Sequence, residues 1–136
     1  MPRSTVANSD VNPAIASWAG PLGLPEFGKI EDSDFEAAFA AALPAHLAEI
    51  EAIASNAEAP TFDNTIVALE LAGDLLDRVS GIYWNLTGAN TNDTLQALER
   101  KLAPELSRHR SAIMMNRALF ERIDTLYQNC ESVGLD

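Results

Sequence analysis

The sequence is poor in the side chains that most often carry chemistry. Its 136 residues include one cysteine, Cys130, and two histidines, His46 and His109. A single cysteine excludes an intramolecular disulfide and any zinc site built from several cysteines. This usage fits a reducing compartment and favours a cytoplasmic location.

Basic residues are also scarce. Nine lysines and arginines stand against 20 aspartates and glutamates, which gives a formal net charge of -11. A surface this negative repels phosphate backbones and anionic lipid head groups. Apolar residues never run together over the roughly 18 positions that a membrane span needs, and the start MPRSTVANSDVNP lacks the apolar stretch of a secretory signal. We therefore expect neither nucleic acid nor a membrane as partner.

The rest of the composition is that of one ordinary globular domain, with 47% hydrophobic and 21% charged residues. Prolines and glycines gather in residues 1–32, where they interrupt any helical pattern. We predict an extended N-terminal arm over 1–32 and a helical domain over 33–136. The later half of the arm is expected to lie as a strap across the helices, and its first ten residues to be loosely held.

Two long helical segments are predicted in the first part of the domain. The first begins at Ser33, where SDFE has the form of a capping box, and its apolar spacing continues to about residue 57. Pro44 lies inside it and predicts a kink without a break. The second begins with Thr61 as N-cap and runs to about Gly88.

Two further helical segments complete the domain. One follows the loop GANTND and carries Pro104 as a second expected kink, and the other begins at Asn116. Apolar alternation at a period of two never persists, so no strand is expected. The predicted fold class is all-α: an antiparallel helical bundle of about four helices, with the Pro/Gly-rich arm in front of it.

The segment 61–88 has an unusual distribution of apolar residues. Treated as one helix, it places its acidic residues within one narrow arc and leaves most of the circumference apolar, which is typical of a buried helix. Gly73 lies within an apolar stripe, where a close approach of another backbone would explain it. Trp84 lies near the polar edge and is hard to bury in so small a bundle. We infer that part of this segment faces a neighbour outside the chain.

Neither histidine lies in a metal-binding pattern. The sequences HLAEI and HRSAI exclude the H-E-x-x-H helix of zinc peptidases, and Leu43 and Leu106 stand where a di-iron Glu-x-x-His motif needs glutamate. His46 and His109 are therefore interpreted as histidines at the edge of the core.

The remaining candidates offer no better chemistry. The acidic pairs Asp74 with Asp77 and Glu49 with Glu51 lack a neighbouring base and fit solvated faces. Cys130 continues the apolar stripe of the last helix, and the glycine-rich GPLGLPEFG follows no strand. The sequence thus predicts no catalytic, cofactor-binding or metal-binding residue in this chain.

Several stretches nevertheless resemble one enzyme family. They are LPEFGKIEDSDFEAAFAAAL, PTFDNTIVALELAGDLLDRVSGIYWNLTGANTNDTLQ, NRALFERIDTLYQ and ESVGLD. Together they are similar to the N-terminal region of the thermolysin-like M3 zinc metallopeptidases, over about residues 12–136. Within the family the resemblance is greatest to the bacterial peptidyl-dipeptidases, with oligopeptidase A also similar.

The resemblance implies a cytoplasmic enzyme that removes dipeptides from the C-terminus of short peptides with a zinc ion held by H-E-x-x-H and a further glutamate. That motif is absent from these 136 residues. The chain is then expected to be the non-catalytic helical part of a longer peptidase, which helps wall the substrate channel. Its partners would be the missing catalytic domain and, in the parent, short peptides. The alternative is a stand-alone helical module that binds another protein.

Overall fold

The described part of the chain is built from helices. The computed structural model describes residues 11–130, and within that range it contains no strand, so the all-α prediction is confirmed. The first ten residues, which were expected to be loosely held, and the stretch ESVGLD lie outside the described residues. The elements are η1 (Pro21–Gly23), η2 (Phe27–Lys29), α1 (Asp34–Ala54), η3 (Phe62–Val67), α2 (Ala68–Leu71), α3 (Asp74–Asn90), α4 (Asp93–Met114) and α5 (Arg117–Gln128).

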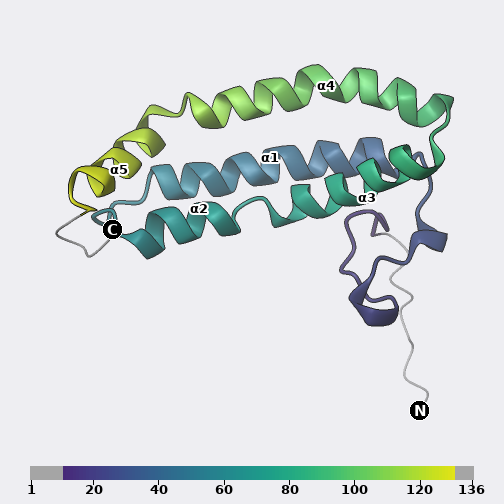
Figure 1. Ribbon diagram of the computed structural model, residues 1–136, viewed down its shortest axis with the longest axis horizontal. Coiled ribbons are helices and arrows are strands. Elements are labelled where there is room, and N and C mark those ends of the chain that lie inside the picture. Colours follow the sequence, from purple (N-terminus) through teal and green to yellow (C-terminus); the bar gives the residue numbers. More distant parts are fainter. Residues whose placement is uncertain (1–10, 131–136) are drawn as a thin grey trace, which may run out of the picture.

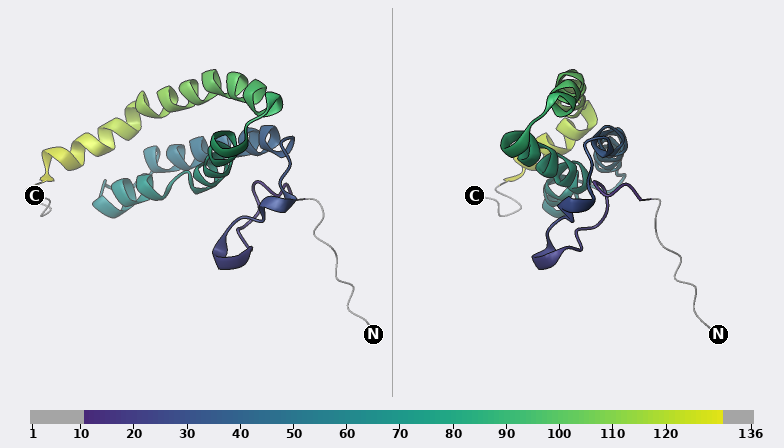
Figure 2. Two further views of the ribbon diagram at one scale, coloured as in Figure 1. Left: turned by 45° about the vertical axis from the view of Figure 1, so that its right-hand side comes forward. Right: turned by 90° about the vertical axis from the view of Figure 1, so that its right-hand side faces the viewer.

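The central helix is α1. It contacts α2, α3, α4 and α5, and Figure 1 shows it between α4 on one side and the α2–α3 segment on the other. The segment α2–α3 runs antiparallel to α1, and α4 runs antiparallel to α3 (Figure 1). In contrast, α5 continues in the general direction of α4 instead of folding back along it (Figures 1 and 2). The length and mean hydropathy of α1 would allow it to cross a membrane. The central helix of a globular protein meets the same criterion, so these two properties do not indicate a membrane span.

The predicted continuous helix over 61–88 is wrong. It begins as expected after Thr61, but Ala72 is extended and Gly73 adopts the left-handed conformation with φ of 88°, which separates α2 from α3. The apolar residues of this segment therefore belong to two helices, so a single helical wheel does not describe their distribution. The central helix is α1 instead.

The N-termini of the first two segments differ from each other. Thr61 and Asn64 form a reciprocal capping box: the Asn64 N–H donates to Thr61 Oγ1 at 3.0 Å, and the Thr61 N–H donates to Asn64 Oδ1 at 2.8 Å. Ser33 makes no such bond, so the capping box predicted there is wrong. The Asp34 carboxylate accepts from the Glu31 N–H at 2.8 Å in its place.

The other boundaries follow the sequence closely. Asn116 caps α5 by accepting from the Leu119 N–H at 3.0 Å, as predicted for the start of the last helix. Pro44 and Pro104 lie inside α1 and α4, and neither proline ends its helix. The break in this molecule occurs at a glycine, where the backbone can take a positive φ without a side-chain clash.

Two separate clusters form at opposite ends of α1. The first, which we call the large core, joins the first half of α1 to α3, α4 and the arm through Ala14, Phe35, Ala38, Phe39, Ala42, Leu76, Val79, Ile82, Tyr83, Leu95, Leu98 and Leu102. The second, which we call the small core, joins the end of α1 to α5 through Ile50, Ile53, Ala54 and Leu119, with partly buried residues of α2 around it.

The arm is held mainly by its first described residues. Ala14 belongs to the large core, and Asn12 Nδ2 donates to the Asp34 carbonyl at 2.8 Å. Arg78 Nη1 also donates to the Ala16 carbonyl at 3.3 Å. The later half does not form the expected strap, because it extends away from the helices (Figure 1) and leaves Leu22 97% exposed.

Candidate functional site

The structure brings the two histidines together, although 63 positions separate them in the sequence. His46 lies on α1 and His109 on α4, and His109 Nε2 is 3.0 Å from His46 Nδ1. Their rings are tilted, with centroids 5.0 Å apart. The prediction placed each histidine separately at the edge of the core, and no sequence signal indicated that they pair.

The pair lies beside the break between α2 and α3. A side chain at Gly73 would place its Cβ about 3.0 Å from the His46 ring, so the glycine is needed for space as well as for its positive φ. The Gly73 N–H donates to Glu49 Oε2 at 2.6 Å. The predicted close approach at Gly73 is therefore with a side chain of α1 and not with another backbone.

The histidine pair has the electrostatics of a structural contact. Burial, and then the neighbouring His46, lower the pKa of His109 from its ordinary value. The short contact requires one ring to donate and the other to accept, which a pair of neutral imidazoles satisfies and a doubly protonated pair does not. One side of His109 lines a hollow of about 370 Å³ together with apolar residues of α1 and with Glu105 and Arg108 of α4.

The residues present do not fit a zinc site. Among residues 11–130, no three His, Cys, Asp or Glu side chains lie close enough together to hold a metal ion. The facing nitrogens of the two histidines are occupied by their mutual hydrogen bond. The acidic pairs lie on solvated faces, where Asp74 forms an ion pair with Arg78 at 3.0 Å, and Cys130 is half-buried at the end of the described chain.

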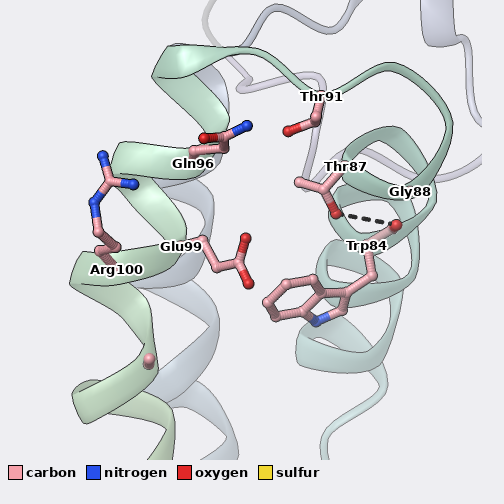
Figure 3. Close-up of a pocket in the computed structure, with 8 residues that line it drawn as sticks. Trp84, Thr87, Gly88, Thr91, Gln96, Glu99 and Arg100 are labelled. Carbon is pink, nitrogen blue, oxygen red and sulfur yellow. Dashed lines mark hydrogen bonds between the residues drawn. The ribbon is translucent and has the colours of Figure 1, made fainter.

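A more promising surface is an open groove between the end of α3 and the first half of α4. It has a volume of about 750 Å³, within the range of about 300–1,000 Å³ that is usual for small-molecule sites. Figure 3 shows Trp84 and Glu99 pointing toward one another from the two helices, while the guanidinium of Arg100 points away. The lining residues are Trp84, Thr87, Gly88 and Thr91 on one side and Gln96, Glu99, Arg100 and Ala103 on the other.

The large core fixes the position of Trp84. Tyr83 is fully buried, and its ring meets those of Phe35 and Phe39 edge-on at centroid distances of 5.3 and 5.4 Å. The Tyr83 ring also contacts Trp84 at 4.9 Å. The Tyr83 hydroxyl donates to the Leu95 carbonyl of α4 at 2.7 Å, which joins the two walls of the groove. Burial, and then the charge of Glu99, raise the pKa of Tyr83, so the hydroxyl keeps the proton it donates.

Several apolar side chains remain exposed on the helices. Leu71 is 72% exposed, Trp84 43% and Met115 82%. The hypothesis that part of the segment 61–88 faces an external neighbour requires exposed apolar residues there, and Leu71 and Trp84 meet this requirement. The exposed set on η3, α2, α5 and the α4–α5 corner, which we call the outer apolar set, comprises Phe62, Val67, Leu71, Met114, Met115, Phe120 and Tyr127.

Comparison with known proteins gives two relatives with the same description. The chain is 40% identical over 126 residues to dipeptidyl carboxypeptidase of Escherichia coli (strain K12), and 39% identical over 125 residues to dipeptidyl carboxypeptidase of Salmonella typhimurium (strain LT2). These matches cover 93% and 92% of this chain, but the chain spans only 18% of the length of either relative. No protein-family model matches the chain. The resemblance to peptidyl-dipeptidases inferred from the sequence is confirmed.

Proposed function

We propose that this chain is the helical N-terminal part of a zinc metallopeptidase of the M3 family that removes dipeptides from the C-terminus of short peptides. One observation carries the proposal: nearly the whole chain matches dipeptidyl carboxypeptidases, and the match takes up less than a fifth of their length. The catalytic residues and the zinc ion would then belong to polypeptide outside these 136 residues. A cytoplasmic location is part of this proposal and agrees with the single cysteine.

The role proposed for this segment is to support and line the substrate channel. The described residues offer no metal cluster, and their one histidine pair bonds to itself. They do offer a helical frame and a groove lined by Trp84 and Glu99. A segment that lines a channel has to present a defined surface and does not need catalytic side chains.

The partner proposed for the outer apolar set is the remainder of the same polypeptide. Most of these side chains lie on the elements that pack around the small core, which has only four buried residues and leaves apolar surface of α2 and α5 exposed. The relatives are more than five times longer than this chain, so most of their mass is available to cover it. Exposed apolar surface of this kind usually marks an interface.

The test is to determine the reading frame beyond Asp136 and to assay its product. We expect an H-E-x-x-H motif with a later glutamate, and release of dipeptides from the C-terminus of short peptides. A variant that lacks the first histidine of that motif is the matched control and should be inactive. A stop codon soon after Asp136 would contradict the proposal.

The alternative is a stand-alone helical module that binds another protein. The same exposed residues, Leu71 and Met115 among them, favour it as much as they favour an interface within one polypeptide. The downstream reading frame separates the two functions, since only the peptidase needs a catalytic domain after this segment.

A further inference from the structure

We propose that the groove between α3 and α4 binds a basic side chain of a peptide, with its guanidinium or ammonium group over the face of the indole ring of Trp84 and beside the carboxylate of Glu99. This inference rests on the proposed function, in which the segment lines a channel for short peptides. It adds a site and a preferred ligand charge to that role.

The two walls offer complementary groups to a cation. Trp84 presents a partly exposed indole ring, and the face of an indole attracts a cation within about 6 Å of its centroid. Glu99 points toward this ring from α4 (Figure 3). No ion pair or hydrogen bond among residues 11–130 occupies the Glu99 carboxylate, which leaves it available to a ligand.

The neighbouring charge makes this choice of ligand specific. Among the lining residues the one basic side chain is Arg100, and its guanidinium points away from the space between the two helices (Figure 3). On α4 the next basic residue, Lys101, is engaged by Glu36 of α1. With a formal net charge of -11, the chain also attracts cations over a longer range and repels anionic ligands.

Contacts behind the groove join its two walls and support Trp84. The Tyr83 hydroxyl bonds to the Leu95 carbonyl, and the Tyr83 ring supports Trp84 from the large core. Thr87 Oγ1 donates to the Trp84 carbonyl at 3.1 Å, within the last turns of α3. Because these contacts already order Trp84, binding a ligand there should cost less side-chain entropy.

The test compares two peptides that differ only in charge. Ala-Arg-Ala and Ala-citrulline-Ala, both blocked at the two ends, are titrated into the chain carrying Trp18→Phe, so that Trp84 is the one remaining tryptophan. We expect a saturable change in Trp84 fluorescence with the arginine peptide and binding about tenfold weaker with the citrulline peptide. The indole N–H signal of Trp84 in the NMR spectrum of the unmutated chain provides a second readout.

A pair of variants tests the role of the carboxylate. Glu99→Gln should weaken binding of the arginine peptide about threefold to tenfold and make it less sensitive to salt than in the unmutated chain. Glu105→Gln removes a carboxylate from the same helix but from a different hollow, and should leave binding unchanged. Far-ultraviolet circular dichroism of each variant verifies that its helical content is intact.

Three results would overturn the proposal. The first is equal binding of the two peptides, and the second is no perturbation of Trp84 by either. The third is binding by this chain but not by the longer protein, which would mean that another part of the polypeptide covers the groove. None of these results bears on the downstream reading frame, so a failure here is distinct from a failure of the proposed peptidase function.

Discussion

The two ends of α1 are stabilised in different ways. At its first half, the large core is built around the edge-on contacts of Phe35, Phe39 and Tyr83. At its last turns, the small core has four buried residues, and the guanidinium of Arg122 joins α5 to the loop before η3. The large core is stabilised mainly by buried apolar side chains. The small core has fewer of them, is supported by the hydrogen bonds of Arg122, and leaves nearby apolar side chains exposed. The second end is therefore the surface for which we propose a neighbour.

The largest effect is expected in the large core. Phe39→Ala removes a fully buried ring and should lower the free energy of unfolding by about 3–5 kcal/mol, measured by urea denaturation. Phe120→Ala, on the exposed side of α5, is the matched control and should change it by less than about 0.5 kcal/mol. Similar losses for the two variants would show that the aromatic contacts do not make the large core the stronger end.

The next effect is expected at Arg122. Its guanidinium donates to the Asn56 and Glu58 carbonyls at 2.8 and 3.0 Å and to Asn64 Oδ1 at 2.9 Å. Arg122→Met removes the donor from the Asn56 and Glu58 carbonyls and one of the donors from Asn64 Oδ1, and should lower the free energy of unfolding by about 2–3 kcal/mol. The exposed Arg117, which pairs with a glutamate on the surface of α5, is the control: Arg117→Met should leave the free energy of unfolding nearly unchanged. If Arg122→Met were as mild, the small core would not depend on this contact.

Two glycines in the same part of the chain should respond with opposite signs. Gly73→Ala places a side chain at a positive φ and against His46, and should lower the free energy of unfolding by at least about 1–2 kcal/mol. Gly81→Ala, inside α3 with open space around its Cβ, should raise it by up to about 1 kcal/mol. Thermal unfolding of both variants checks the prediction. A stabilising Gly73→Ala would mean that the α2–α3 break is not present in solution.

The smallest effect is expected at His109: the free energy of unfolding should depend on pH. Because the pKa of His109 is lowered in the folded chain, the unfolded chain binds a proton there more readily. The associated stability is fully present above the ordinary pKa of 6.5, and is lost as the pH falls through the lower folded-state value. The loss between pH 7.5 and pH 5.5, measured by urea denaturation, should be greater for the unmutated chain than for His109→Gln. Equal losses would contradict a buried, neutral His109.

Local signals in the sequence predicted most of the fold. Apolar spacing and the caps at Thr61 and Asn116 located the helices, because these depend on residues within a few positions of one another. The break at Gly73 was missed because a glycine within an apolar pattern reads equally as a tolerated residue or as a stop. Here the extended Ala72 and the packing of His46 decide between the two readings.

The candidate sites were less predictable because they depend on contacts between distant segments. The pairing of His46 with His109 requires α1 and α4 to lie in register, which no local pattern specifies. Trp84 stood out as difficult to bury, but Glu99 is one of 20 acidic residues and has no local feature that distinguishes it. Only the fold shows that it faces an indole ring.

The central claim, that the outer apolar set is covered by the rest of a longer peptidase, is tested most directly by methionine oxidation. Met114 and Met115 are 74% and 82% exposed, so in this chain hydrogen peroxide should oxidise them nearly as fast as in the denatured chain, as measured by peptide mass spectrometry. In the longer protein both should be oxidised several-fold more slowly, because another part of the polypeptide covers them. Equal oxidation rates in the two proteins would contradict the account.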